Sequence, residues 1–180
     1  ELVIRWRFKV PPYGGGRMGH DGTLYEFGQW YPRLAVYDDL RGWNHEPYIG
    51  AGEFYLEYGR FEVDLTVPAG YVVAATGDLQ NESEKQWLKN KKPFTREPKP
   101  KKQPTQKKPV EETGITSSRK TKTIQYKQNN VHDFAWFADK RFNVLKSEVE
   151  LPVSKRKVTT WQMFLNKNAD GWLKRRTDLN

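Results

Sequence analysis

The chain has 180 residues with a formal net charge of +9 and a mean hydropathy of −0.90. This length suffices for one domain with a sizeable core, and 7 Trp, 9 Tyr and 9 Phe exclude a wholly disordered chain. The lack of cysteine excludes disulfides and thiolate metal sites. No apolar run approaches the roughly 18 residues of a membrane-spanning helix. The chain opens on strand-like sequence without signal-peptide features, so we expect an excerpt of a longer protein.

Alternating apolar and polar residues predict a series of short β-strands. Residues 2–10 (LVIRWRFKV) set five apolar side chains on one face and three cations on the other, which is typical of a half-buried antiparallel strand. Residues 11–22 and 41–52 are rich in turn formers and are predicted to be turns or irregular loop. Further strands are expected at two places within 23–39, with Pro32 at an edge, and at 54–68, 71–79, 122–128, 132–139, 142–151 and 157–161.

The turn Pro68-Ala69-Gly70 predicts that the strands on either side of it pair as a hairpin. At the other end of the chain, apolar residues from Trp161 to Leu173 recur at helical spacing. The predicted fold is therefore all-β: an antiparallel β-sandwich-like domain over residues 1–160, with one C-terminal amphipathic helix over 161–180.

The excess positive charge lies in one stretch of the chain. Between Lys85 and Val110 there are ten basic residues and one acidic residue, which account for the whole net charge. Proteins that bind single-stranded nucleic acid interleave cations with stacking aromatics, whereas Phe94 is the only aromatic residue between Asn90 and Val110. Five prolines lie in the same stretch. We therefore expect residues 82–121 to be a solvated, basic Pro/Lys-rich loop insertion, with no nucleic-acid partner.

His45-Glu46 matches the first half of the zinc-peptidase signature H-E-x-x-H. That signature needs a second histidine one helical turn later, so that both imidazoles face one metal ion. Position 49 is Ile49 instead, and Pro47 disfavours a helix interior at this point. We therefore interpret His45 as a loop histidine and expect no metal site in this chain.

A glycine pattern also resembles a known site. Gly14, Gly16 and Gly19 satisfy G-x-G-x-x-G, but the following HDGTLYEF predicts a turn and a strand. A dinucleotide site needs a helix N-terminus there to hold the pyrophosphate. The pattern therefore indicates a flexible hairpin loop.

Several other residues are interpreted as structural. Asp38 or Asp39 is expected to bind backbone N–H groups of the loop 40–52, and His132-Asp133 is expected to be a hydrogen-bonded pair. The expected aromatic anchors of the core or loops are Trp30, Trp43 and Trp136.

Three separated blocks then match a known family in the right order: QWYPRLAVYDDLRGW (29–43), GEFYLEYGRFEVDLTVPAGYVVAATGDLQN (52–81) and VHDFAWFAD (131–139). Together they resemble the N-terminal β-domain of zinc aminopeptidases of the aminopeptidase N type, in a bacterial branch of that family. The resemblance covers most of the chain outside 82–121. Residues 157–180 are similar to the last strand of that domain and the first helix leading to the catalytic domain.

The resemblance implies a non-catalytic domain of a zinc enzyme. The family's Gly-x-Met-Glu-Asn segment, its H-E-x-x-H motif with a distant Glu, and its oxyanion-stabilising Tyr do not occur in this sequence. The chain is therefore expected to bind no zinc and to have no catalytic residue, while its parent uses zinc to remove N-terminal residues from peptides. The expected partners are the parent's own catalytic domain and, in the parent, the peptide substrate. Relatives in this branch are often exported, which implies a cell-envelope location.

The resemblance also implies one substrate-binding residue. In the family, this domain forms a wall of the active-site cleft and places a Gln or Glu near the substrate's free amine. By order along the chain that residue is Gln29, whose amide oxygen can accept a hydrogen bond from an ammonium group. An alternative from another class stays open: a free-standing β-sandwich module that binds glycans or acidic polymers through surface aromatics and the basic loop.

Overall fold

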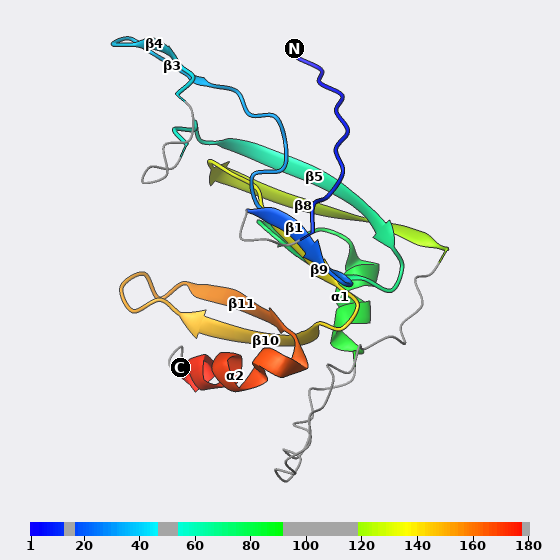
Figure 1. The fold of residues 1–180 in the computed structure, drawn as a ribbon. Helices are drawn as coiled ribbons and strands as arrows, with labels where there is room; N and C mark the ends of the chain where they lie inside the picture. The colour runs from blue at the N-terminus through cyan, green and yellow to red at the C-terminus, as the bar shows by residue number, and fades with distance from the viewer. Residues whose placement is uncertain (13–16, 47–53, 92–118, 178–180) are drawn as a thin grey trace, which may run out of the picture. The chain divides into compact units, whose positions relative to one another are not determined.

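The computed structural model describes residues 1–12, 17–46, 54–91 and 119–177, and strands predominate among them (Figure 1). The chain forms two compact units, each described by itself below. The first unit comprises Glu1–Thr66, Val73–Asn81 and Thr123–Asp139, and the second comprises Val67–Val72, Glu82–Lys122 and Lys140–Asn180.

The first unit holds most of a four-stranded sheet with strand order β1-β2-β9-β6, in which β1–β2 and β2–β9 pair antiparallel. These strands are β1 (Met18–Asp21), β2 (Leu24–Phe27), β6 (Val72–Ala75) and β9 (Trp136–Asp139). The register pairs Phe27 with both Met18 and Trp136. The rings of Phe27 and Trp136 stack 4.0 Å apart, and Phe27 is buried. One face of this sheet therefore packs into an aromatic core.

A three-stranded sheet with strand order β5-β8-β7 adds to the first unit. Its strands are β5 (Gly59–Pro68), β7 (Asp78–Leu79) and β8 (Thr121–Val131). Alternation in β8 buries Ile124 and Tyr126, and the Tyr126 hydroxyl donates to the Val73 carbonyl over 2.9 Å. On the solvent side, the hydroxyls of Thr66 and Thr123 are 2.9 Å apart. The period-2 pattern of the sequence thus decides which face is buried.

A separate two-stranded hairpin pairs β3 (Val36–Asp38) with β4 (Gly42–Asn44). The Asp38 carboxylate accepts hydrogen bonds from the backbone N–H groups of Leu40 and Arg41, at 3.0 and 2.6 Å, so the expected tie from Asp38 to the following loop is confirmed. These hydrogen bonds lower the pKa of Asp38, and the bond from the Arg41 N–H has the largest effect. Residues 42–44 form a strand, so the prediction of irregular loop is wrong there, and 47–53 lie outside the described residues.

In the second unit, a long hairpin is followed by the short helices η1 and α2 (Figure 1). The hairpin pairs β10 (Asn143–Glu150) with β11 (Lys157–Phe164). The short 3₁₀ helix η1 (Asn166–Asn168) leads into α2 (Ala169–Thr177), which runs alongside the hairpin in Figure 1. Buried apolar residues in this unit include Phe142, Phe164, Leu165 and Ala169.

Helix α1 (Glu82–Lys89) also belongs to the second unit. It carries Glu82 in its first turn and Lys89 in its last, as the helix dipole favours. The buried Glu84 carboxylate accepts from the Lys122 ammonium over 2.6 Å, and the same ammonium lies 3.7 Å from the centre of the Trp87 ring. Burial lowers the pKa of Lys122, and the carboxylate of Glu84 opposes that shift.

The all-β prediction with a C-terminal helix is confirmed, but two element boundaries are corrected. The C-terminal helix begins at Ala169 rather than Trp161, because 161–164 pair with β10 and helical spacing of apolar residues does not exclude a strand. The predicted loop insertion 82–121 begins with helix α1, because its first residues are helix formers and its prolines start only at Pro93. The rest of that insertion, 92–118, lies outside the described residues.

The predicted hairpin around Pro68-Ala69-Gly70 is also wrong. The turn exists, with the Tyr71 N–H donating to the Pro68 carbonyl over 3.0 Å, but β5 and β6 belong to different sheets. The chain crosses from one sheet to another at this turn, because β8 rather than β6 supplies the hydrogen-bonding partner of β5.

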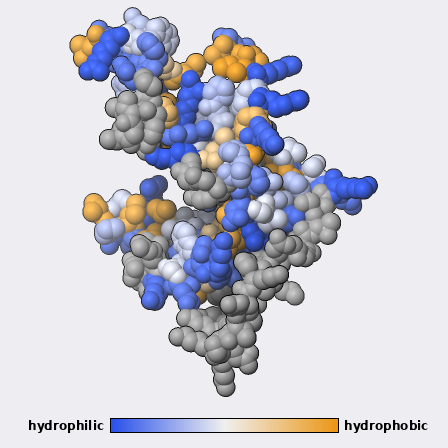
Figure 2. All heavy atoms as spheres, in the orientation of Figure 1, coloured by the Kyte–Doolittle hydropathy of each residue, from blue (hydrophilic) through white to orange (hydrophobic). Residues whose placement is uncertain are grey.

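Residues 2–10 do not form the predicted strand. Among the described residues they pair with no strand, and the one bridge nearby joins Pro12 to His20. Trp6 and Phe8 lie against Trp30 and Phe27, with ring centroids 6.0 and 6.4 Å apart, yet both stay more than a third exposed. Figure 2 shows such exposed apolar residues as orange groups on a largely hydrophilic surface. Alternation alone cannot supply the neighbouring strand that a ladder needs.

Gly77 offers a direct test of the packing between β7 and β8. Its φ of +92° suits glycine, and an added Cβ would lie 2.5 Å from the Lys127 carbonyl oxygen. We expect Gly77→Ala to lower the free energy of unfolding by about 2 kcal/mol or more, through backbone strain and steric overlap. Urea denaturation followed by circular dichroism measures this. Gly70→Ala is the matched control, because nothing lies within 4 Å of its Cβ position; equal effects of the two substitutions would contradict the prediction.

Candidate functional site

A pocket of about 450 Å³ opens on the first unit and includes the sequence-predicted Gln29. Its volume lies within the range of about 300–1,000 Å³ that is usual for ligand sites. The sheet contributes Glu26, Phe137 and the small residues Gly28 and Ala135. The other lining residues come from loops and from the ends of strands: Arg17, Gln29, Arg33, Phe54, Leu56, His132 and Asp133.

The sheet part of the lining follows from strand register. Glu26 pairs with Gly19 on one side and with Phe137 on the other. Directly opposed residues share one face of an antiparallel sheet, so Glu26 and Phe137 project from the face opposite to buried Phe27. Glycine is required at Gly28, because its N–H lies 2.8 Å from the Arg17 carbonyl oxygen and an added Cβ would lie 2.7 Å from that atom.

Gln29 follows directly after this close approach. Its φ of +27° is unusual for a residue with a side chain, and it lies in the loop after β2, not on a strand. Its side chain lines the pocket together with Glu26 and Arg33. Gln29, the residue that the family resemblance selects, therefore lies among the polar side chains that line this pocket.

Asp133 joins several parts of this lining. One carboxylate oxygen accepts from the Tyr31 hydroxyl at 3.0 Å and from the Phe134 N–H at 2.7 Å, and the other lies 2.7 Å from the Arg33 guanidinium. The expected pair with His132 is therefore wrong, because these donors take the carboxylate. The His132 ring lies against Tyr58 instead, with centroids 5.4 Å apart.

Aromatic rings hold the Arg33 guanidinium in place. Its central carbon lies 5.3 Å from the centre of the Tyr31 ring and 5.5 Å from that of Phe54, a cation–π geometry. Trp30 beside it donates its indole N–H to the Phe134 carbonyl over 3.0 Å, which confirms its role as an anchor. Trp136 is an anchor too, stacked on Phe27, whereas Trp43 is 62 % exposed on the β3–β4 hairpin.

The described part of the chain contains no cluster of three or more His, Cys, Asp or Glu side chains that could hold a metal ion. His45 is exposed, and its Nδ1 lies 3.0 Å from the Trp43 carbonyl oxygen. Within the same residues, no helix has both the length and the apolar character needed to cross a membrane. The glycines Gly14 and Gly16 of the sequence pattern lie outside the described residues, whereas Gly19 lies in β1. The predicted turn over 11–22 is therefore wrong for 18–21, because these residues pair with β2 as a hairpin.

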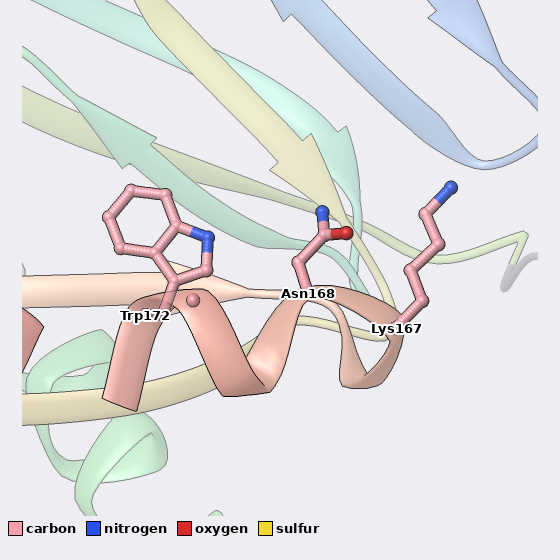
Figure 3. A pocket seen from close by; sticks show the side chains of 4 residues that line it. Lys167, Asn168 and Trp172 are labelled. Carbon is pink, nitrogen blue, oxygen red and sulfur yellow. The ribbon is translucent and has the colours of Figure 1, made fainter. Parts of the chain in front are cut away.

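A second, more open hollow of about 420 Å³ lies on the second unit at the start of α2. Lys167, Asn168, Gly171 and Trp172 line it, and Figure 3 shows the three longer side chains projecting from one side of the η1–α2 segment. Trp172 is 43 % exposed there. Trp161 on β11 is 40 % exposed, so both tryptophans of this region present apolar surface.

No family model, curated protein or solved structure matches this chain.

Sequence reasoning named Gln29, which lies on this pocket, but it did not name Glu26, Phe137 or the network around Asp133. The sequence predicted that Glu26 and Phe137 lie on strands. It did not predict that these two residues lie opposite each other, because β2 and β9 are far apart in the sequence. Arg33 and Tyr31 flank Pro32 in the sequence, yet their common partner, Asp133, lies about a hundred positions later.

Tyr31 gives a titration test of this network. Burial first, and then the Asp133 carboxylate, raise the pKa of Tyr31 from 10.0 to about 12. Because the pKa is raised on folding, the stability that Tyr31 contributes is complete below pH 10 and is lost as the pH rises toward 12. Ultraviolet absorbance of tyrosinate should show a transition near pH 12 that Tyr31→Phe removes. An unchanged absorbance curve in Tyr31→Phe would contradict the assignment.

Proposed function

We propose that this chain is the non-catalytic β-domain of a zinc-dependent aminopeptidase of the aminopeptidase N type. In this proposal the parent enzyme removes N-terminal residues from peptides by attack of a metal-activated water. The zinc and its ligands belong to a catalytic domain outside this sequence. The domain described here forms one wall of the active-site cleft and packs on the catalytic domain.

The observation that carries the proposal is the place of Gln29. The residue that the family resemblance selects lies on the pocket lining, in a loop held by the Arg17–Gly28 backbone contact. A glutamine on a pocket wall can accept a hydrogen bond from a substrate ammonium group. The all-β fold with a helix after the last strand agrees with the expected order of elements.

The second unit supports the packing part of the proposal. Trp161 and Trp172 are each at least 40 % exposed, and the hollow beside Trp172 adds a concave surface (Figure 3). Tryptophan buries a large apolar area when a partner covers it. We assign the exposed surfaces of these two tryptophans to the contact with the catalytic domain.

A second candidate function is a free-standing module that binds glycans or acidic polymers. The exposed ring pair Tyr37–Trp43 favours it, with centroids 5.2 Å apart and exposures of 66 % and 62 %. The encoding gene decides between the two candidates. A reading frame that continues past Asn180 into Gly-x-Met-Glu-Asn and H-E-x-x-H supports the aminopeptidase, and a stop codon there supports the module.

In the full-length enzyme, we expect Gln29→Ala to raise KM for aminoacyl anilides by about five- to tenfold, because one hydrogen bond to a charged group is lost. Steady-state kinetics at neutral pH measure this. Gln80→Ala is the matched control, because Gln80 is exposed and does not line the pocket. Its side-chain amide donates to the Asp78 carbonyl, and its backbone N–H donates to the Gln125 carbonyl. An unchanged KM in Gln29→Ala would contradict the role proposed for Gln29.

A further inference from the structure

The charges that line the pocket of the first unit are unequally engaged. The Arg33 guanidinium and the Asp133 carboxylate form an ion pair at 2.7 Å, so they offset each other. Arg17 has an interaction partner of its own. No hydrogen bond or ion pair joins the Glu26 carboxylate to any other residue that the structure describes. Glu26 is therefore the charge in this lining that remains available to a ligand.

The surroundings of Glu26 favour a cation with an apolar stem. Its cross-strand neighbour is Phe137, and Phe54 and Leu56 line the same pocket. A carboxylate beside aromatic rings attracts an ammonium or guanidinium group both as an ion pair and through the ring faces. Apolar walls also suit the methylene stem of a lysine or arginine side chain.

The position of Glu26 separates it from Gln29. Glu26 projects from the sheet within β2, whereas Gln29 lies in the loop that follows the strand. Gly28, which lies between them in the sequence, has no side chain, and the cross-strand neighbour of Glu26 on β1 is Gly19. The sheet therefore places few side-chain atoms around the Glu26 carboxylate. A ligand can therefore place one polar group at Gln29 and a second, cationic group at Glu26.

We propose that this pocket binds the side chain of a basic amino-acid residue, with Glu26 as the acceptor of its cation and Phe137 and Phe54 as its aromatic walls. This inference gives the site a substrate class, peptides that begin with Lys or Arg, and that part rests on the proposed function. Binding of the basic side chain by the 180-residue chain itself does not depend on the proposed function.

The direct test is an NMR titration of the ¹⁵N-labelled 180-residue chain with two matched probes. N-acetyl-L-lysinamide carries only the side-chain ammonium, and N-acetyl-L-norleucinamide is its neutral analogue. We expect the lysine probe to shift pocket resonances and to bind about tenfold more tightly, as one ion pair with aromatic contacts allows. Equal binding of the two probes, or no binding of either, overturns the proposal.

Substitutions place the effect on Glu26. We expect Glu26→Gln to abolish the preference for the lysine probe and Glu26→Asp, which keeps the charge, to retain part of it. Glu148→Gln is the control, because Glu148 is exposed on β10 in the second unit. A preference that survives in Glu26→Gln overturns the assignment. A third probe, L-norleucinamide, carries only an α-ammonium group. If it binds in a Glu26-dependent way while the lysine probe does not bind, the assignment is also overturned.

The parent enzyme provides a readout that separates the two proposals. We expect Glu26→Gln to lower kcat/KM for lysine p-nitroanilide by about tenfold and to change that for leucine p-nitroanilide by less than about twofold. Equal losses for both substrates overturn the specificity role. A parent that cleaves neither anilide contradicts the proposed function, while the NMR result for the isolated chain still decides whether the pocket binds a basic side chain.

Discussion

The carboxylate of Asp133 is the interaction on which the pocket depends. It binds the Tyr31 hydroxyl, the Arg33 guanidinium and the Phe134 N–H at 2.7–3.0 Å. Tyr31 and Arg33 lie about a hundred positions earlier in the chain, so this one side chain fixes a long-range loop against the start of β9. Charge-assisted hydrogen bonds are stronger than neutral ones, and their loss would leave a partly buried guanidinium without a counterion.

The neighbouring aromatic residues make this arrangement rigid. Phe134 is fully buried, its carbonyl accepts the Trp30 indole N–H, and its ring stacks near Phe61 of β5. The two larger sheets therefore meet at the residue that follows Asp133. On this frame the short β1–β2 hairpin carries Glu26 and Gln29 to the same pocket. A loop site held by a packed core in this way can keep its polar groups in place without substrate, which suits both roles that we propose for this wall.

The sequence predicted strands best where alternation was long and a pairing strand was present. Alternation located β5, β8, β10 and β11, because each pairs with another strand along its length and turns one side further from solvent than the other. It failed for residues 2–10, whose pattern is as regular, because no strand among the described residues pairs with them. Pairing across Pro68 failed for a related reason: local turn chemistry does not reveal that β8 competes for β5. Gln29 was selected through a family resemblance, and its role stays a prediction. Glu26 and Asp133 required tertiary contacts, since ordinary acidic residues carry no local signal of a shared pocket.

A double-mutant cycle on Tyr31 and Asp133 tests most directly whether this carboxylate organises the site. Tyr31→Phe, Asp133→Asn and the double variant would be compared with the unaltered chain by urea denaturation at pH 7. We expect a coupling free energy of about 1–2 kcal/mol, because the two side chains share a partly buried hydrogen bond. Pocket resonances of Gln29 and Arg33 should shift in both single variants. Additive effects, with a coupling near zero and unchanged pocket resonances, would contradict the account.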